Sequence, residues 1–408
     1  MRVCLFTDTL NDVNGVSRFI RNVGDQAAAA GNELHIITST RLPEPPDGAR
    51  AFIHNVPPLY ARAMPGYANL ELAIPLRRRL RALTRAIKPD AVHISTPGPV
   101  GFHGRAIARK MGIPILGTYH TDFPAYIQHL FNEPAFTWVC TKYMAWFYRR
   151  FTRIFTRSDD YGRALVRLGV PAEHIVRLLP GIDTGAFDAR ERDCSGKIWR
   201  NCPGVRPASI KAIYVGRVSV EKNLPLLTRV WPRISDTCRA RGIDAQLLVV
   251  GDGPYRAQME AELDGHDAAF LGFRHGKELS TIYASSDLFM FPSTTDTLGQ
   301  VVMEAQCAGL PVVVTDQGGP SEVVDDGATG FVLPADSEAE WVATVSRIIA
   351  DEPLRRRMGA AATAKIAPMT IKNSFAHFWS VHEEALGTGH QALVRNLRRF
   401  GTSLMPRA

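Results

Sequence analysis

The sequence contains no long hydrophobic run: no segment approaches the roughly 18 consecutive apolar residues of a membrane-spanning helix. Its six cysteines are scattered and include no C-x-x-C pair, which disfavours zinc sites and disulfides and favours reduced core thiols. The first eight residues pass directly from an apolar segment into a polar loop, without the longer apolar region of a signal peptide. These absences predict a soluble protein of the cytoplasm.

Two further absences concern cofactors. No G-x-G-x-x-G follows any of the early strand patterns, so a dinucleotide-dependent dehydrogenase is disfavoured. No group of His, Cys, Asp and Glu residues has the spacing of a metal site, and we expect neither a metal nor another cofactor. The chemistry should therefore come from the side chains and the backbone of the chain.

The charge balance limits the partners. Lysine and arginine number 48 against 40 aspartates and glutamates, which gives a net charge of +8. A basic chain suits a phosphate-bearing ligand, an anionic membrane surface or nucleic acid. Nucleic-acid binding would also require a recognised module with basic and aromatic residues on one face, which the sequence lacks, so we expect no such partner.

Apolar strand patterns alternate with helical patterns twice, over residues 1–185 and again over 209–368. This rhythm predicts an α/β protein with two doubly wound parallel sheets, whose carboxyl-end loops face a cleft between two domains. Residues 186–208 are expected to be a linker with an exposed insertion, and residues 389–408, with four arginines and no acid, a basic tail. The strands are expected at Val3–Phe6, Leu34–Thr38, Ala91–Ser95, Ile113–Tyr119, Ile154–Arg157, Ala212–Gly216, Gln246–Gly251, Ala269–Phe273, Leu288–Phe291 and Pro311–Thr315.

The segment Phe291–Thr315 carries two acids eight residues apart, Asp296 in a turn and Glu304 in a helix expected from about Leu298 to Ala308. Eight helical residues rise on the order of 12 Å, about the distance from the sugar to the ribose of a nucleotide-sugar. The N–H groups of Leu298 and Gly299 would open this helix and suit a diphosphate. The alternative is that both acids are ordinary helix caps or solvated side chains.

Two cations follow the first strand of the second domain, in Gly216-Arg217-Val-Ser-Val-Glu-Lys222. Fixed cations at the end of a buried strand can neutralise a diphosphate and hold it as it leaves. The alternative is an ordinary surface pair. In the first domain, Gly15 opens the first helix and His120 ends a strand, where a plain turn and a structural histidine are the alternatives.

In order and spacing, Gly15, His120, Arg217 with Lys222, Asp296 with Glu304, and Gly318-Gly319 resemble the retaining glycosyltransferases of family 4, which have the GT-B fold of two Rossmann-like domains. Asp296 stands where the family's E-x7-E element has its first glutamate and is one methylene shorter. The segments Thr7-Asp-Thr, Val13-Asn-Gly-Val-Ser-Arg and Tyr119-His-Thr-Asp-Phe are most similar to members that glycosylate lipids such as diacylglycerol or phosphatidylinositol.

The resemblance implies roles for these residues. Arg217, Lys222 and the helix start near Gly299 would stabilise the leaving diphosphate, Glu304 would bind the ribose, and Asp296 with His120 would orient the sugar. Retention by same-face attack, without a metal, is the usual mechanism of the family. A helix over 369–388 would return to the first domain, and Asp122 and Tyr126 are acceptor candidates. The remaining donor-binding candidates are Gly15, Gly251, Phe273, Arg274 and Leu298.

We therefore expect transfer of a hexose from a UDP-hexose or GDP-mannose to a membrane lipid. A polysaccharide or other soluble acceptor is the alternative, as is a nucleotide-sugar epimerase on the same fold. A sugar-nucleotide-binding protein without activity is disfavoured because Lys222 and Glu304 are both present.

A basic segment, Leu76–Lys88, has an apolar stripe at helical spacing together with six basic residues, among them Arg77, Arg78, Arg79 and Arg81. Such a helix can lie on an anionic membrane, or it can dock its apolar stripe on the core and leave the basic face in solvent. Trp146–Arg153 is a second aromatic and basic stretch. The membrane reading predicts a peripheral protein on the inner face of the cytoplasmic membrane.

Overall fold

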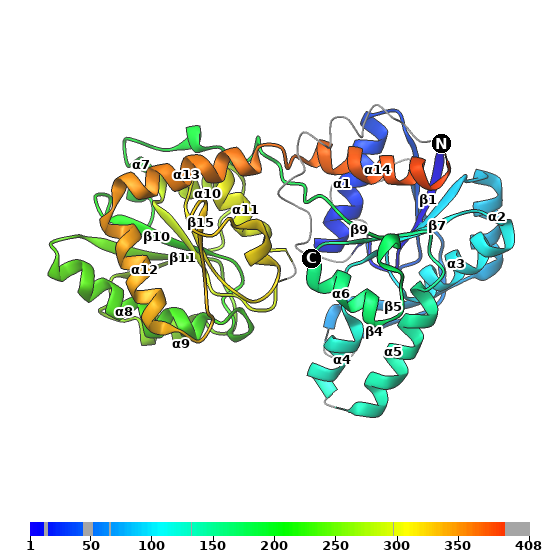
Figure 1. The fold of residues 1–408 in the computed structure, drawn as a ribbon, viewed down its shortest axis with the longest axis horizontal. Helices are drawn as coiled ribbons and strands as arrows, with labels where there is room; N and C mark the ends of the chain where they lie inside the picture. Colours follow the sequence, from blue (N-terminus) through cyan, green and yellow to red (C-terminus); the bar gives the residue numbers. More distant parts are fainter. Residues whose placement is uncertain (12–14, 44–51, 65–66, 132, 297, 388–408) are drawn as a thin grey trace. The chain divides into compact units, whose positions relative to one another are not determined.

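The computed structural model describes residues 1–11, 15–43, 52–64, 67–131, 133–296 and 298–387, so the expected basic tail lies outside the described residues. The chain forms two compact units, residues 1–179 together with the helix that begins at Ile371, and residues 180–370 (Figure 1). No helix within the described ranges is both long enough and apolar enough to cross a bilayer. Each unit is an α/β sandwich built on its own parallel sheet.

The first unit has a seven-stranded parallel sheet in the order β3-β2-β1-β6-β7-β8-β9. Its central strands are almost wholly apolar because helices cover both faces of the sheet. The strands are β1 (Arg2–Phe6), β2 (Glu33–Thr38), β3 (Ile53–Asn55), β6 (Ala91–Ile94), β7 (Ile115–Tyr119), β8 (Arg153–Thr156) and β9 (Ile175–Arg177), with a separate antiparallel hairpin of β4 (Pro58–Met64) and β5 (Tyr67–Pro75). The helices are α1 (Gly15–Ala29), α2 (Arg77–Ile87), α3 (Pro99–Met111), α4 (Phe123–Phe131), α5 (Pro134–Tyr148), α6 (Asp159–Arg167) and α14 (Ile371–Ala385).

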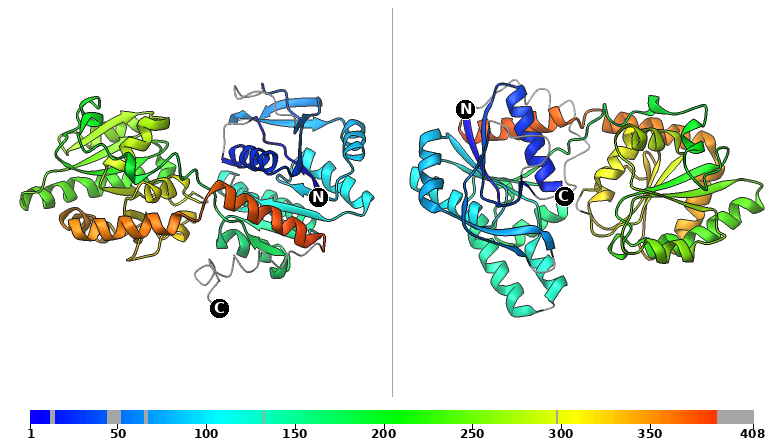
Figure 2. Two further views of the ribbon diagram at one scale, coloured as in Figure 1. Left: turned by 90° about the horizontal axis from the view of Figure 1, so that it is seen from above. Right: turned by 180° about the vertical axis from the view of Figure 1, so that it is seen from behind.

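Helix α14 completes the first unit and lies beside α1 (Figure 2). Phe378 is fully buried and packs on Phe155 of β8, with ring centroids 5.3 Å apart. His382, also fully buried, lies with its Nε2 3.1 Å from Nδ1 of His93 on β6. Burial lowers the pKa of both imidazoles, to about 4 for His382 and well below its usual range for His93. Two neutral histidines therefore join the last helix to the sheet.

The second unit has a six-stranded parallel sheet in the order β12-β11-β10-β13-β14-β15. The strands are β10 (Ile210–Val215), β11 (Ala245–Val250), β12 (Ala268–Gly272), β13 (Leu288–Phe291), β14 (Val312–Thr315) and β15 (Gly330–Leu333). The helices are α7 (Lys197–Arg200), α8 (Leu224–Ala240), α9 (Arg256–Glu262), α10 (Gly276–Ser285), α11 (Gln300–Cys307), α12 (Glu338–Ala350) and α13 (Glu352–Ile366), with short 3₁₀ turns η2 (Ala189–Glu191), η3 (Val220–Lys222) and η4 (Gly319–Val323).

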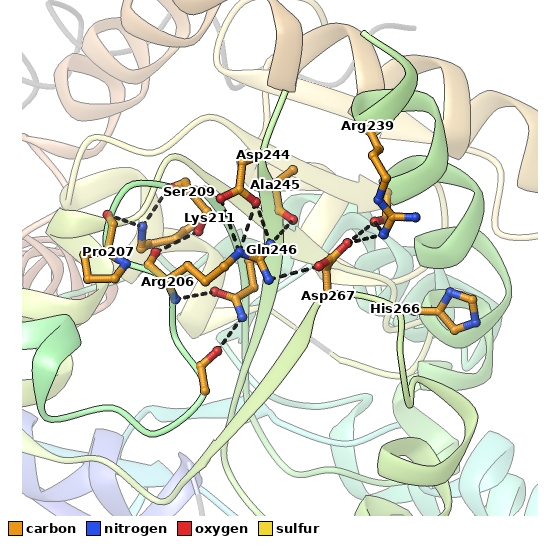
Figure 3. A network of polar contacts seen from close by, with 12 residues as sticks. Arg206, Pro207, Ser209, Lys211, Arg239, Asp244, Ala245, Gln246, His266 and Asp267 are labelled. Carbon is orange, nitrogen blue, oxygen red and sulfur yellow. Dashed lines mark hydrogen bonds and ion pairs between the residues drawn. The ribbon is translucent and has the colours of Figure 1, made fainter. Parts of the chain in front are cut away.

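The stretch 186–208, which the sequence predicts as a linker with an exposed insertion, is instead partly built into the second unit. Trp199 and Cys202 are each only 3% exposed and belong to its core. Arg206 forms ion pairs with Asp244 at 2.6 Å and Asp267 at 2.9 Å, beside the amino ends of β11 and β12 (Figure 3). The charged residues of this stretch suggested a loose segment. In the structure, the charge of Arg206 binds the stretch to the amino ends of the strands, the end opposite their carboxyl ends.

Candidate donor and acceptor sites

The order of the second sheet fixes where a ligand should bind. β10 lies between β11 and β13, so the chain leaves it in one direction through β11 and β12 and returns on its other side through β13 to β15. In open parallel sheets, ligands bind outside the carboxyl ends of the strands at this reversal, the topological switch point. The loops after β10 and β13 are therefore the first place to look.

Two glycines let the loops after β10 and β11 touch. Gly216 and Gly251 have φ of 153° and 132°, values that side chains disfavour. A Cβ on Gly251 would stand 1.9 Å from the carbonyl oxygen of Gly216, so no side chain fits there. Bare backbone therefore lines this part of the switch point.

Two of the residues predicted for the site meet at the switch point. Lys222, in the 3₁₀ turn after β10, places its Nζ 2.8 Å from Oδ2 of Asp296, which follows β13. Their side chains are 21% and 26% exposed, so the pair is accessible but partly sheltered. The Arg217 side chain is 71% exposed, and its Nη1 lies 3.9 Å from Oε1 of Glu221. Lys222 is held in position, whereas Arg217 extends into solvent.

The Gly318-Gly319-Pro320 turn supports the loop that carries Asp296. The N–H of Gly319 donates to the carbonyl of Asp296 at 2.8 Å, and a Cβ on Gly318 would stand 2.9 Å from that same oxygen. Gly299 has φ of 69°, and a Cβ there would meet Pro320 at 2.9 Å. The Gly318-Gly319 turn, which is part of the resemblance to family 4, thus packs directly against the Asp296 loop.

The helix after this loop begins later than expected. α11 starts at Gln300 with Gly299 as its N-cap, so Leu298 and Gly299 precede the helix rather than opening it. The estimate of 12 Å between the acids assumed eight helical residues and does not apply, because Leu298 and Gly299 lie before the start of the helix. Both residues remain next to the helix amino end.

Glu304, on α11, is 7% exposed and accepts a hydrogen bond from the Tyr283 hydroxyl at 3.2 Å. Burial, and secondarily the Glu304 carboxylate, raises the pKa of the Tyr283 phenol well above its usual range. The phenol therefore stays protonated and donates to the carboxylate. Tyr283 on α10 fixes an acid that the sequence singles out, and no local pattern in the sequence indicates this partner.

The loop after β12 brings two more candidates to the carboxyl ends of the strands. The Phe273 ring is 64% exposed and stacks on His275, with centroids 6.2 Å apart. Nε of Arg274 lies 3.4 Å from Oε1 of Glu278, so this cation is already paired. An exposed aromatic ring of this kind can stack on a base.

The switch point of the first unit lies between β1 and β6, and Asp8 closes it. The Asp8 carboxylate accepts hydrogen bonds from the Thr96 hydroxyl at 2.7 Å and from the backbone N–H of Val100 at 2.7 Å, in the first turn of α3. Burial raises the pKa of Asp8 to about 6, although these hydrogen bonds favour the anion and lower the pKa. The sequence predicts no role for Asp8, because its partners Thr96 and Val100 lie 88 and 92 residues further along the chain.

His120 follows β7 and lies beside this switch point. Its Nε2 is 3.1 Å from the Ser95 hydroxyl, and its ring meets Phe19 edge to face at 5.7 Å. Nδ1 has no hydrogen-bond partner among the described residues. Burial, with the Arg157 charge second, lowers the pKa of His120 well below its usual range, so the ring is neutral. Gly15, at the start of α1, has open space around its Cα.

The acceptor candidates lie at the start of α4. Asp122 accepts from the Tyr119 hydroxyl at 3.1 Å and from the backbone N–H of Ala125 at 3.3 Å, so it serves as a cap for this helix. Tyr126 is part of α4, but its side chain lies outside the described part of the structure.

Helix α2 carries the basic segment. Leu80 is fully buried, and Leu83 and Ile87 pack against the core of the first unit. Arg77, Arg78 and Arg79 are exposed, and Arg81 is half-buried. The apolar stripe is therefore docked on the core, and only the basic face is open to solvent.

Comparison with known proteins agrees with this geometry. The family model described as "Glycosyltransferase Family 4" matches residues 13–186, and the one described as "Glycosyl transferases group 1" matches 197–365. The chain is 32% identical to a GDP-mannose-dependent alpha-mannosyltransferase of Mycobacterium tuberculosis, over 82% of this chain and 84% of that protein.

Two other relatives are named for different activities. A sulfoquinovosyl transferase of Arabidopsis thaliana is 31% identical over 85% of this chain, which spans 64% of the plant protein. An alpha-monoglucosyldiacylglycerol synthase of Acholeplasma laidlawii is 24% identical over 83% of this chain and 86% of its own. Among solved structures, the Anabaena protein HepE in complex with UDP has the same fold, with a TM-score of 0.73 and 16% identity over 94% of this chain and 100% of that one.

Proposed function

The chain belongs to glycosyltransferase family 4, a family of two-domain GT-B hexosyltransferases, and we propose that it moves a hexose from a nucleotide-sugar to a hydroxyl group of a membrane lipid. An alpha-monoglucosyldiacylglycerol synthase among its relatives favours the lipid acceptor, and the exposed arginines of α2 are suited to an anionic membrane surface. This would place the protein at the inner face of the cytoplasmic membrane.

One observation carries the donor site: the Lys222–Asp296 ion pair at the switch point of the second sheet. A donor diphosphate would form an ion pair with Lys222 in place of Asp296. Arg217, which extends into solvent, would then turn toward the diphosphate as a second cation. Asp296, released from Lys222, would then accept hydrogen bonds from the sugar hydroxyls. Glu304 would bind the ribose, held in place by Tyr283.

The remaining donor contacts come from backbone and aromatic groups. Leu298 and Gly299 would bring backbone N–H groups toward the phosphates, with the dipole of α11 behind them. Gly251, whose N–H donates to the Gly272 carbonyl at 2.9 Å, would let the donor approach the backbone because it has no side chain. The Phe273 ring would stack on the base, and Arg274 would lie beside it. None of these contacts distinguishes uracil from guanine.

In the chemical step, the bond between the anomeric carbon and the donor phosphate breaks while the acceptor oxygen bonds to the same face of that carbon. The acceptor proton passes to the leaving diphosphate, so the configuration is retained and no side chain needs to act as nucleophile. Lys222 and Arg217 stabilise the negative charge that develops on the leaving group. No metal takes part in this scheme.

The first unit would supply the groups that meet the sugar and the acceptor. His120 is neutral, and its Nδ1 is the atom available to hydrogen-bond a sugar hydroxyl. Gly15, at the open start of α1, would allow the donor to approach the backbone. Asp122 and Tyr126 would face the acceptor.

The test is a screen of UDP- and GDP-hexoses against vesicles that contain diacylglycerol or phosphatidylinositol, with purified wild type and Lys222→Ala. Lys277→Ala, an exposed lysine paired with Glu191 in the same unit, is the matched control. We expect a glycolipid from the wild type and the control but not from Lys222→Ala. Donor turnover without a lipid product would overturn the lipid acceptor, and an absence of turnover together with an absence of nucleotide binding would overturn the transferase.

A further inference from the structure

A cationic pocket lies on the first unit, away from its switch point. It has a volume of about 760 Å³ and lies between α3, α5 and the end of α6. Six of its lining residues are basic, and no described lining residue is acidic. These six are Arg105, Arg109, Lys142, Arg149, Arg150 and Arg167. The pocket is therefore an unneutralised positive site.

Arg105 is the unusual member because it is only 4% exposed. Its guanidinium lies over the Trp146 ring at 4.1 Å, and Nη2 donates to the Trp146 carbonyl at 3.1 Å. Its Nε has no hydrogen-bond partner, and no ion pair joins Arg105 to a carboxylate within the described ranges. A buried cation is costly unless an anion compensates it, so this site favours an anionic ligand.

Helix α5 adds exposed apolar surface next to these cations. Trp138, Val139 and Trp146 are 62%, 58% and 49% exposed. Together with Lys142 they recur at helical spacing along one side of α5, which pairs with α4 in the first unit (Figure 1). Exposed tryptophans beside cations are typical of the headgroup region of membranes, where an aromatic ring has one apolar and one wet side.

The contrast with α2 decides which helix can enter a bilayer. α2 turns its leucine and isoleucine side chains into the core and offers only charge to the outside. α5 buries Phe147 and Tyr148 in the core but leaves its tryptophans exposed. Of these two helices, α5 alone combines exposed apolar side chains with a pocket for an anion among the described residues.

We propose that α3, α5 and the end of α6 form a docking surface for an anionic phospholipid bilayer. The pocket around Arg105 receives a lipid phosphate, and the tryptophans of α5 lie at the boundary between headgroups and acyl chains. This surface belongs to the first unit, whereas the Lys222–Asp296 pair belongs to the second, and the pocket is lined by none of the α2 arginines. Binding of the bilayer to this surface requires neither the donor nor the acceptor of the transferase reaction.

The test is sedimentation of the full-length protein with phosphatidylcholine vesicles, with and without phosphatidylglycerol. Arg149→Gln/Arg150→Gln removes two exposed cations of the pocket and leaves Arg105 and the core intact. Its matched control is Arg356→Gln/Arg357→Gln, a neighbouring exposed arginine pair on α13. Trp138→Ala probes the aromatic contribution without disturbing Arg105.

At about fivefold in affinity per cation near the membrane surface, the pocket double variant should bind anionic vesicles about 30-fold more weakly than the wild type. The α13 double variant should bind within twofold to threefold of the wild type, because its two arginines do not line the pocket and exposed charges contribute little free energy. Trp138→Ala should weaken binding to the same anionic vesicles.

Three results would overturn the proposal. The first is that the wild type does not sediment with anionic vesicles. The second is an equal loss of affinity in both double variants, which would indicate net charge alone. The third is that inorganic phosphate binds to the wild type, and not to Arg149→Gln/Arg150→Gln, while vesicles bind neither; the pocket would then serve a soluble anion. Because these vesicles contain no donor and no acceptor, none of these results depends on whether the transferase reaction occurs.

Discussion

The two units have the same kind of sheet but opposite switch points. In the second unit, glycine backbone and two cations, Arg217 and Lys222, stand at the carboxyl ends of β10 and β13. In the first unit, Asp8 projects from the end of β1 and its carboxylate accepts the first N–H groups of α3. The site in the second unit is accessible and carries two cations, each beside a carboxylate, whereas the site in the first unit is filled by the chain itself.

The difference depends on what occupies the amino end of the helix at each switch point. The amino end of a helix attracts an anion because its N–H groups lack partners and the helix dipole is positive there. Asp8 supplies that anion to α3 from within the chain. The first unit therefore offers a neutral His120 beside a closed switch point, whereas the second unit leaves Arg217 and Lys222 at an accessible one.

Lys222→Ala should produce the largest effect because Lys222 is the cation that is held in position at the open switch point. Removing one preorganised group that stabilises a developing charge lowers kcat by about 10²–10³-fold. We expect a loss of this size in glycolipid formation, measured with saturating donor and acceptor. Arg217→Ala should lose less, because its side chain is largely solvated. If Arg217→Ala were the more damaging variant, Lys222 would not be the main cation.

Acid should destabilise the first unit specifically. Burial lowers the pKa of His377 and His382 to about 4, and those of His93 and His120 well below the usual range. Unfolded histidines titrate near 6.5, so between pH 6.5 and 4 the unfolded chain binds more protons and stability falls as pH falls. For His382 alone this amounts to about 2 kcal/mol between pH 7 and pH 5. Asp8, with its pKa raised to about 6, opposes this by about 1 kcal/mol.

Urea unfolding at pH 7 and pH 5 measures this loss in the free energy of unfolding. The double variant His93→Leu/His382→Leu removes both partners of one buried pair together and should lose less stability on acidification than the wild type. Equal losses in the two proteins would show that the histidine pair does not govern the acid sensitivity.

Asp8→Ala should remove the difference between the two switch points, because it takes away the carboxylate that caps α3. Loss of a capping carboxylate costs about 1–2 kcal/mol of stability, which thermal unfolding measures. Inorganic phosphate should then stabilise the variant more than the wild type, because a free anion can replace the carboxylate at α3. Asp351→Ala removes the N-cap of α13 in the second unit, where Asp351 accepts from the N–H of Leu354 at 2.8 Å, and is the matched control. No difference in phosphate response between Asp8→Ala and wild type would contradict this account of α3.

Tyr283→Phe should have the smallest effect. It removes one hydrogen bond to Glu304, worth about 1 kcal/mol, and leaves the carboxylate in place. We expect the donor KM to rise by up to about fivefold with kcat nearly unchanged, because the ribose contact is the same in ground and transition states. A fall in kcat with an unchanged KM would indicate that Glu304 acts in the chemical step.

The sequence predicts both sheets well because their strands are local apolar patterns: every expected strand overlaps an observed one, and no end is shifted by more than two residues. It does not predict the short strands β3, β9 and β15 or the hairpin of β4 and β5, whose patterns are brief or mixed. It identifies Lys222 and Asp296, which the structure brings together.

Other features depend on contacts that are distant along the chain. Asp8 caps a helix whose N–H group lies 92 residues further on, and Tyr283 reaches Glu304 from 21 residues before it. Trp199 enters the core from a stretch whose composition suggests a loop. No local pattern carries this information, because the partner is chosen by the tertiary fold.

The most direct test of the account is hydrogen–deuterium exchange of the wild-type protein with and without UDP or GDP. If the donor diphosphate binds at the open switch point, the nucleotide should protect residues 216–223, 251–254 and 298–300 in the second unit. The closed switch point, residues 7–11 and 95–101, should exchange as before. Protection of the first unit's switch point instead, or no protection at either site by either nucleotide, would contradict the assignment of the donor site.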